Sequence, residues 1–215
     1  MSQFAFVFDM DGVIVDSNTL HAKAWYVYLS QYGVPADSML KRMHGKRNDQ
    51  IVRELFGSEL TEQQVFAHGA AKEELYRTMM RPQLKEHLVP GLLDFLHENR
   101  LRPMAVASNA EPANVDFVLD EADLRQYFQV VVNGHQVEYP KPHPEIYLRT
   151  AELLGVSPAQ CVVFEDSPSG IHAAKAAGTR IVSVRTTEAK LPETDWSVTD
   201  FREPQLASWI EEAER

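Results

Sequence analysis

The chain has 215 residues, of which 44% are hydrophobic and 24% charged, and its formal net charge is −10. Such a composition is ordinary for a globular protein and excludes a fibrous or largely disordered chain. The negative charge argues against nucleic acid or an anionic membrane as a partner. No apolar run reaches the length of a membrane span, and the first residues lack the features of a secretory signal. We therefore expect a cytoplasmic protein.

The first predicted element is a strand that ends in two carboxylates. The run from Phe4 to Phe8 is apolar without polar alternation, as in a strand buried on both faces of a parallel sheet, and Asp9 and Asp11 follow it. Residues two apart in an extended segment point to the same side, so both carboxylates can face one volume, where they repel each other unless a cation or proton intervenes. Mg²⁺ would relieve that repulsion and neutralise an incoming phosphate. Taken alone, the pair is equally typical of a solvated turn.

The next segment, residues 18–86, has several helical patterns and no convincing strand. Ala71, Leu75 and Met79 recur at a spacing of four residues, which predicts a helix packed through that stripe. We interpret the segment as a helical insertion between the first strand and the remaining ones.

This pattern predicts two domains. Residues 1–16 and 87–215 form an α/β core domain, and residues 17–86 form a helical cap domain. The connections lie near Asp16 and near His87 to Pro90, and a pair of linkers permits hinge motion.

The rest of the chain alternates strands with helices. A helix is predicted from Pro144 to Gly155, and another from Pro168 to Ala177 with Ser167 as its N-cap. Alternation of this kind is typical of a Rossmann-like parallel sheet with helices on both faces, which is an α/β fold. The predicted strands are Met104 to Ala107, Val130 to Val132, Cys161 to Phe164 and Ile181 to Val184.

Polar residues follow these strands, where open α/β sheets bind their ligands. Ser108 and Asn109 follow the second strand, Glu165 and Asp166 follow the fourth, and Lys141 stands between two prolines in the connection before it. Each has an ordinary interpretation as a cap, a loop charge or a turn acid. Together they are the groups that hold a metal ion and a phosphate.

The chain resembles the haloacid dehalogenase superfamily, in the branch that contains β-phosphoglucomutase and related sugar phosphatases. Four segments carry the resemblance, in the family's order and with a helical insertion after the first. They are DMDGV from Asp9 to Val13, SNA from Ser108 to Ala110, Lys141 within PKPHPEIY, and EDSPSG from Glu165 to Gly170.

The resemblance implies a role for each acidic residue. Asp9 would be the nucleophile that forms an aspartyl-phosphate, and Asp11 would be general acid and then general base. Mg²⁺ would be held by a side-chain oxygen of Asp9, the backbone carbonyl of Asp11 and the carboxylate of Asp166, with Glu165 in a supporting position.

The resemblance also implies how the phosphate is bound. Ser108 and Lys141 would contact its oxygens, and Asn109 would bind substrate beside them. The catalytic residues would then be Asp9, Asp11, Ser108 and Lys141. Lys141 would also keep Asp9 ionised, because its positive charge offsets the repulsion between a carboxylate and a phosphate dianion.

Substrate selection is expected in the cap. His21 could contact the leaving hydroxyl or tune Asp11, and Lys46 and Arg47 could reach the cleft as substrate-binding cations. The alternatives are a histidine that packs at the seam between cap and core, and a solvated basic pair.

A phosphomutase needs a second phosphate site, and the chain departs from β-phosphoglucomutase there. Ala110 and Pro112 stand where that enzyme has a serine and an asparagine, and Arg47 matches its cap arginine only with a shift of one residue. We therefore expect a Mg²⁺-dependent phosphoric monoester hydrolase acting on a small sugar or polyol phosphate, as a monomer or small homo-oligomer. A β-phosphoglucomutase-type mutase and a non-catalytic phosphate-binding regulator are the alternatives.

Overall fold

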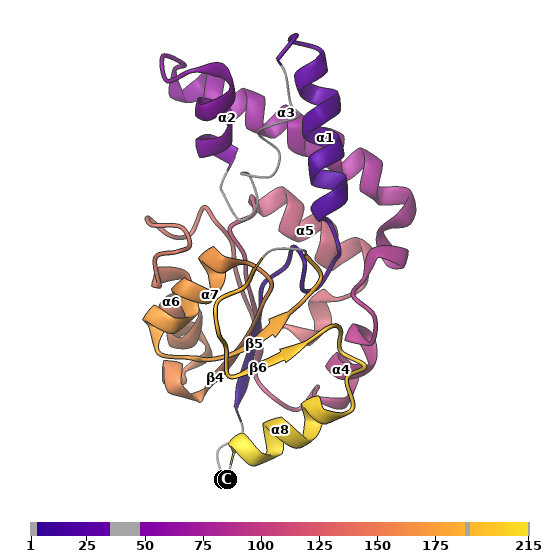
Figure 1. Cartoon of the computed structure of the whole chain (residues 1–215), viewed down its shortest axis with the longest axis vertical. Coiled ribbons are helices and arrows are strands. Elements are labelled where there is room, and N and C mark those ends of the chain that lie inside the picture. The colour runs from indigo at the N-terminus through magenta and orange to yellow at the C-terminus, as the bar shows by residue number, and fades with distance from the viewer. Residues whose placement is uncertain (1–3, 35–47, 188–189, 215) are drawn as a thin grey trace.

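The computed structural model describes residues 4–34, 48–187 and 190–214. Within them a six-stranded sheet has the strand order β3-β2-β1-β4-β5-β6, with every neighbouring pair parallel (Figure 1). The strands are β1 (Ala5–Phe8), β2 (Met104–Ala107), β3 (Val130–Val132), β4 (Cys161–Glu165), β5 (Arg180–Val184) and β6 (Trp196–Val198). The α/β fold and the first five strands are thus confirmed, each within one residue, whereas β6 was not predicted.

Helices cover both faces of this sheet. Phe6 and Phe8 of β1 point to the face that packs on α4 (Leu92–Glu98), α5 (Pro112–Glu121) and α8 (Gln205–Ala213), and Ala5 and Val7 to the face covered by α6 (Glu145–Leu154) and α7 (Pro168–Ala177). Because both faces are buried, the strand reads as a continuous apolar run.

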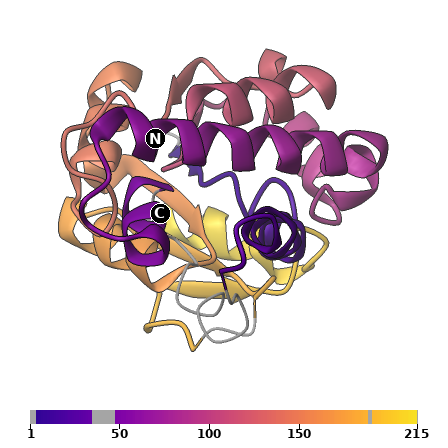
Figure 2. The same ribbon diagram turned by 90° about the horizontal axis from the view of Figure 1, so that it is seen from above.

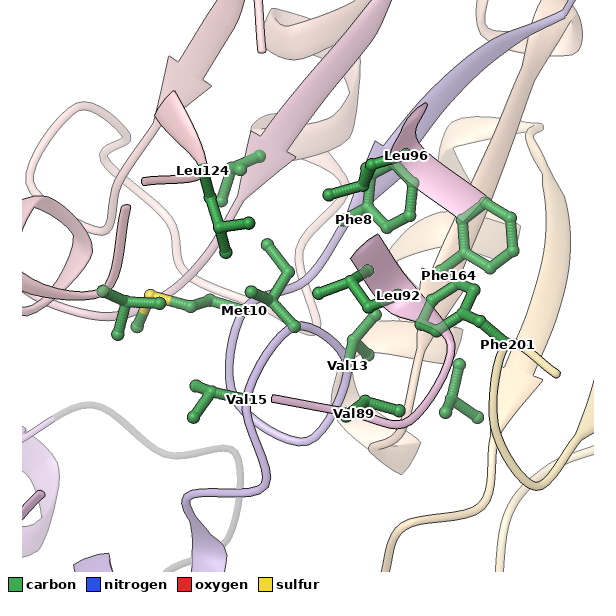
Figure 3. Packing of buried hydrophobic residues seen from close by; sticks show 14 of the residues in the cluster. Phe8, Met10, Val13, Val15, Val89, Leu92, Leu96, Leu124, Phe164 and Phe201 are labelled. Carbon is green, nitrogen blue, oxygen red and sulfur yellow. The ribbon is translucent and has the colours of Figure 1, made fainter. Parts of the chain in front are cut away.

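On the face of the sheet to which Phe6 and Phe8 point, aromatic rings pack among aliphatic side chains (Figure 3). The rings of Phe8 and Phe164, on neighbouring strands, stack with centroids 4.8 Å apart, and Phe201 packs against both. Full burial of one such side chain contributes about 1.5–3 kcal/mol, which holds the carboxyl ends of β1 and β4 together.

The ends of α7 and the carboxyl end of α6 are as predicted. The Ser167 hydroxyl accepts a hydrogen bond from the backbone N–H of Gly170, and Gly178 ends α7 in the left-handed conformation. Gly155 ends α6 in the same way, although Pro144 is the residue before its first turn instead of the first helical residue. The short 3₁₀ helices are η2 (Arg81–His87), η3 (Arg125–Tyr127) and η4 (Pro158–Gln160).

The insertion forms a separate helical layer over the carboxyl ends of the strands. It contains α1 (Asn18–Ser30), α2 (Asn48–Phe56) and α3 (Glu62–Met80), which share an apolar cluster of their own. Seen from above in Figure 2, α3 runs across the molecule and α1 is viewed along its axis. None of the described helices combines the length and apolar character needed to cross a membrane.

The two connections between this layer and the sheet lie side by side. The backbone N–H of Asp16 donates to the carbonyl of His87 at 2.8 Å, and that of Val89 to the carbonyl of Ile14 at 3.0 Å. We propose that the boundary between the core and cap domains lies at these paired segments, at residues 16/17 and 86/87.

The helix predicted from the apolar stripe is confirmed as α3, and Leu75 and Met79 pack against the core, but Ala71 is exposed. The fully buried face of α3 contains Lys72, Glu73 and Tyr76, which the stripe did not include. A polarity pattern assigns lysine and glutamate to the solvent face, but here Lys72 and Glu73 form an ion pair at 2.8 Å inside the protein.

Candidate active site

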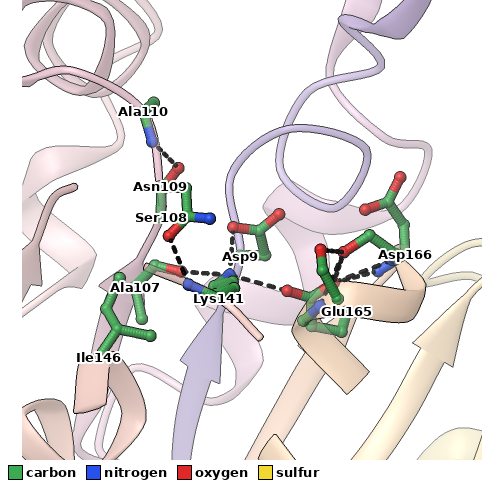
Figure 4. Close-up of polar contacts among 12 residues, drawn as sticks. Asp9, Ala107, Ser108, Asn109, Ala110, Lys141, Ile146, Glu165 and Asp166 are labelled. Atoms are coloured by element: carbon green, nitrogen blue, oxygen red, sulfur yellow. Dashed lines mark hydrogen bonds and ion pairs between the residues drawn. The ribbon is translucent and has the colours of Figure 1, made fainter. Parts of the chain in front are cut away.

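The polar residues that follow the strands converge at the carboxyl edge of the sheet. Figure 4 shows Asp9, Lys141, Glu165 and Asp166 arranged around one volume, with Ser108 next to them. All five are buried, with 8% of Asp9 and 6% of Lys141 exposed. Because β1 lies between β2 and β4, the ends of these three strands are neighbours in space although their motifs are far apart in the sequence.

Lys141 is the centre of this arrangement. Its Nζ donates to Asp9 Oδ1 at 2.8 Å, to Glu165 Oε1 at 2.7 Å and to the carbonyl of Ala107 at 2.9 Å. Burial disfavours the ammonium, but Asp9 and Glu165 outweigh it and raise the pKa of Lys141 to about 12. The lysine is therefore a fixed positive charge beside Asp9.

Glu165 is saturated with hydrogen bonds. Its Oε1 accepts from Lys141 and from the hydroxyl of Tyr147, and its Oε2 accepts from the backbone N–H groups of Asp166 and Ser167 and from the Ser167 hydroxyl. Burial raises the pKa of this carboxyl, but Lys141 and the donated hydrogen bonds outweigh it and hold the pKa below its usual value. A carboxylate with all its lone pairs in use supports its neighbours instead of binding a ligand directly.

Asp9, Glu165 and Asp166 form an acidic group whose oxygen atoms lie within 4.8 Å of one another. Burial, with Glu165 and Asp166, raises the pKa of Asp9 well above its usual value although Lys141 opposes this. Hard oxygen donors that repel one another fit a divalent cation such as Mg²⁺. With Glu165 saturated, Asp9 and Asp166 are the side chains suited to hold it.

Asp11 lies outside this acidic group, although it is only two residues from Asp9. Its Oδ1 accepts hydrogen bonds from the Ser17 hydroxyl at 2.6 Å and from His21 Nε2 at 3.3 Å. Burial raises the pKa of Asp11, but the two hydrogen bonds outweigh it and lower the pKa. The two aspartates thus have different surroundings, as two residues with different chemical tasks require.

His21 is a residue of α1 and lies where the helical layer meets the sheet. Lys72 Nζ lies 2.8 Å from His21 Nδ1, and because an ammonium can only donate, Nδ1 accepts and the ring proton sits on Nε2, facing Asp11. The ring of Tyr76 stacks on the imidazole with centroids 3.7 Å apart. His21 is therefore held in one tautomer and one orientation.

Of the remaining predicted residues, Ser108 and Asn109 lie beside the site. Ser108 Oγ accepts from the backbone N–H of Ala110 at 3.1 Å. Asn109 Oδ1 accepts from the backbone N–H of Lys141 at 3.2 Å, so Asn109 holds the loop that carries Lys141 in place. Lys46 and Arg47 lie outside the described residues.

Sequence reasoning missed several residues that complete the site. These are Ser17, Lys72, Tyr76 and Tyr147, which contact Asp11, His21 or Glu165. Lys72 and Tyr76 are four residues apart and so share one face of a helix, which was the available signal for these two residues. The apolar stripe of Ala71, Leu75 and Met79 indicated the neighbouring face as the buried one.

A close backbone approach explains Gly12 and yields a testable prediction. Its φ is +82°, and a Cβ there would lie 1.9 Å from Asp166 Oδ2. Gly12→Ala is expected to displace the Asp166 carboxylate and to raise the Mg²⁺ concentration needed for half-maximal activity by about tenfold or more, to be measured by metal titration. Gly178→Ala is the matched control, because its φ is +78° but nothing lies within 4 Å of the added Cβ. An equal metal requirement in both variants would contradict the prediction.

The fold and the site together define a class of protein, an α/β enzyme with buried carboxylates and one lysine at the carboxyl edge of its sheet. The family model for haloacid dehalogenase-like hydrolases matches residues 5–178. The chain belongs to this family, as its motifs predicted.

Comparisons with individual proteins agree. The chain is 36% identical to the fructose-1-phosphate phosphatase YqaB of Escherichia coli, over 83% of this chain and 95% of that protein. It is 30% identical to the β-phosphoglucomutase of Bacillus subtilis, over 84% of this chain and 82% of that protein. A crystal structure of β-phosphoglucomutase from Clostridium difficile has the same fold, with a TM-score of 0.88, 22% identity and coverage of 99% of this chain and 98% of that one.

Proposed function

We propose that the protein is a Mg²⁺-dependent phosphatase that hydrolyses a small phosphorylated metabolite, a sugar or polyol phosphate, through a covalent phosphoryl group on Asp9. The observation that carries the proposal is the buried cation of Lys141, 2.8 Å from Asp9, which belongs to an acidic group with Glu165 and Asp166. The name of the relative from Escherichia coli, a sugar-phosphate phosphatase, supports the same substrate class.

In the first step, a carboxylate oxygen of Asp9 attacks the phosphorus atom and the bond to the leaving oxygen breaks. Lys141 offsets the repulsion between carboxylate and phosphate, and the Ser108 hydroxyl donates to a phosphate oxygen. Mg²⁺, held by Asp9 and Asp166, would supply further positive charge for the phosphate oxygens.

Asp11 performs both proton transfers. The charge of an incoming phosphate raises the pKa of a nearby carboxyl, so Asp11 takes up a proton and donates it to the leaving oxygen. Asp11 then accepts a proton from the water that attacks the phosphoryl group on Asp9. His21 and Ser17 hold the carboxylate in place during both transfers.

A β-phosphoglucomutase-type mutase is the second candidate, favoured by the relative from Bacillus subtilis. The loop after Ser108 argues against it. Glu111 lies there at the start of α5 and forms an ion pair with Arg77 of α3 at 2.7 Å. A carboxylate at this place repels a second phosphate and occupies a cation that could bind one, so water is the favoured acceptor.

The proposal is tested with a panel of hexose and polyol monophosphates, by measuring released phosphate. The same panel run with an Asp9→Asn preparation excludes a contaminating phosphatase. Conversion of β-glucose 1-phosphate to glucose 6-phosphate without net release of phosphate would favour the mutase. Absence of both activities would favour a phosphate-binding regulator.

Removal of divalent metal is expected to lower phosphate release by at least about a hundredfold, because buried carboxylates and a phosphate would then share one cation, Lys141. The measurement is the rate after dialysis against EDTA and again after addition of Mg²⁺. A rate that survives thorough chelation would remove the metal from the proposal.

A further inference from the structure

Glu73 is a buried carboxylate that the mechanism above does not use. It lies on α3 in the cap and is 3% exposed. Its Oε1 accepts from Lys72 Nζ at 2.8 Å and from Asn48 Nδ2 at 2.8 Å, and its Oε2 accepts from Asn114 Nδ2 at 2.7 Å. Lys72 and Asn48 belong to the cap, whereas Asn114 belongs to core helix α5. Glu73 therefore joins the two parts of the protein.

The contact with α5 is oriented as well as close. Arg77 NH1 donates to Asn114 Oδ1 at 2.7 Å, and because a guanidinium can only donate, the amide oxygen must face it. The amide nitrogen then points to Glu73, which can only accept. The same Arg77 atom reaches Glu111 at 2.7 Å, so the amide of Asn114 cannot turn without losing a partner on each side.

The contact with Lys72 leads to the active site. Lys72 is 1% exposed, and a buried ammonium requires a counter-charge. Glu73 supplies it, and the attraction of Lys72 outweighs burial and lowers the pKa of Glu73 to about 2. Lys72 in turn donates to His21 Nδ1, which leaves the Nε2 proton for Asp11.

We propose that Glu73 is a positioning residue that makes the placement of Lys72 and His21 against Asp11 depend on the docking of α3 against α5. With the cap docked, Asn114 and Lys72 hold Glu73 between them, and Lys72 lies at His21. When the cap separates from α5, Glu73 loses its core partner and Lys72 loses its fixed position. The inference rests on the proposed phosphatase function for its kinetic meaning.

The central experiment reverses the polarity of the contact across the seam. Glu73→Gln places an amide N–H opposite the amide N–H of Asn114, and we expect kcat to fall about 10- to 100-fold, as for a lost hydrogen bond to a charged group, with KM changed less than about threefold. In the double variant Glu73→Gln with Asn114→Asp, the glutamine can donate to the new carboxylate while Arg77 keeps its acceptor. We expect this variant to recover most of the lost kcat.

The matched control is Glu121→Gln. It removes an ion pair with Arg81, which also joins the end of the α3 segment to α5 but does not touch the line from Glu73 to His21. We expect its kcat to equal that of the wild type. Wild-type kcat in Glu73→Gln, or no recovery in the double variant, would overturn the proposal. If Glu73→Gln does not fold, Asn114→Ala carries the test, and wild-type kcat there would overturn it equally.

A spectroscopic measurement separates this inference from the proposed function. The ¹⁵N shifts of His21 should show an unprotonated Nδ1 in the wild type. In Glu73→Gln they should show a mixture of the two tautomers, with the proton on Nδ1 in one and on Nε2 in the other. Identical His21 shifts in the two proteins would overturn the role of Glu73. If the wild type releases no phosphate but the shifts change as expected, the proposed function fails and the positioning role stands.

Discussion

Replacing Asp9 by asparagine is expected to lower phosphate release by at least about a thousandfold, because an amide oxygen is a poor nucleophile. Glu165 is saturated with hydrogen bonds and Asp11 is held by Ser17 and His21, so neither is free to take its place. The measurement is the steady-state rate of the purified variant on the best substrate of the panel.

Asp94→Asn is the control for this variant. Asp94 is exposed on α4, so the same chemical change there should leave the rate unaltered. A rate for Asp9→Asn above about 1% of the wild type would contradict the assignment of Asp9 as the nucleophile.

Replacing Lys141 by methionine is expected to lower both activity and stability. The variant leaves Asp9 and Glu165 buried without their cation and the carbonyl of Ala107 without its donor. Breaking a buried ion pair from one side costs about 3–5 kcal/mol in the free energy of unfolding. Loss of the charge beside the nucleophile should lower kcat by about a hundredfold or more.

The stability loss should depend on pH. Without Lys141, the pKa of Glu165 rises above its unfolded value, and the pKa of Asp9, which burial already raises in the wild type, rises further. The folded variant therefore binds more protons than the folded wild type does. The variant therefore recovers stability, relative to the wild type, as the pH falls from 7 towards 5. Urea unfolding at both pH values measures this, with Lys175→Met on the exposed face of α7 as control. An equal difference at both pH values would contradict the ion-pair explanation.

The sequence predicted those parts of the site that follow a strand directly. A buried strand is a continuous apolar run, and the residue after it lies at the carboxyl edge of the sheet, as Asp9 and Ser108 do. β6 was missed because it has three residues and its first two are not buried, so it lacks an apolar run.

The sequence left open which side chains meet across the seam between cap and core. Contact with Asp11 was one of two roles expected for His21, but no local pattern indicated that Lys72, 51 residues further along the chain, holds His21. Polarity by itself favours a surface position for Lys72 and Glu73, but a charge is buried when a partner compensates it, and that partner is known only from the fold.

Composition, apolar runs and four short motifs were thus enough to determine the α/β class, the family and the residues that follow the strands, because these are encoded locally. Tertiary structure alone decided that Lys141 also binds Glu165, that Ser17 binds Asp11, and that Glu73 meets Asn114. The physical reason is that the energy of a buried charge depends on neighbours that folding brings together from distant parts of the chain.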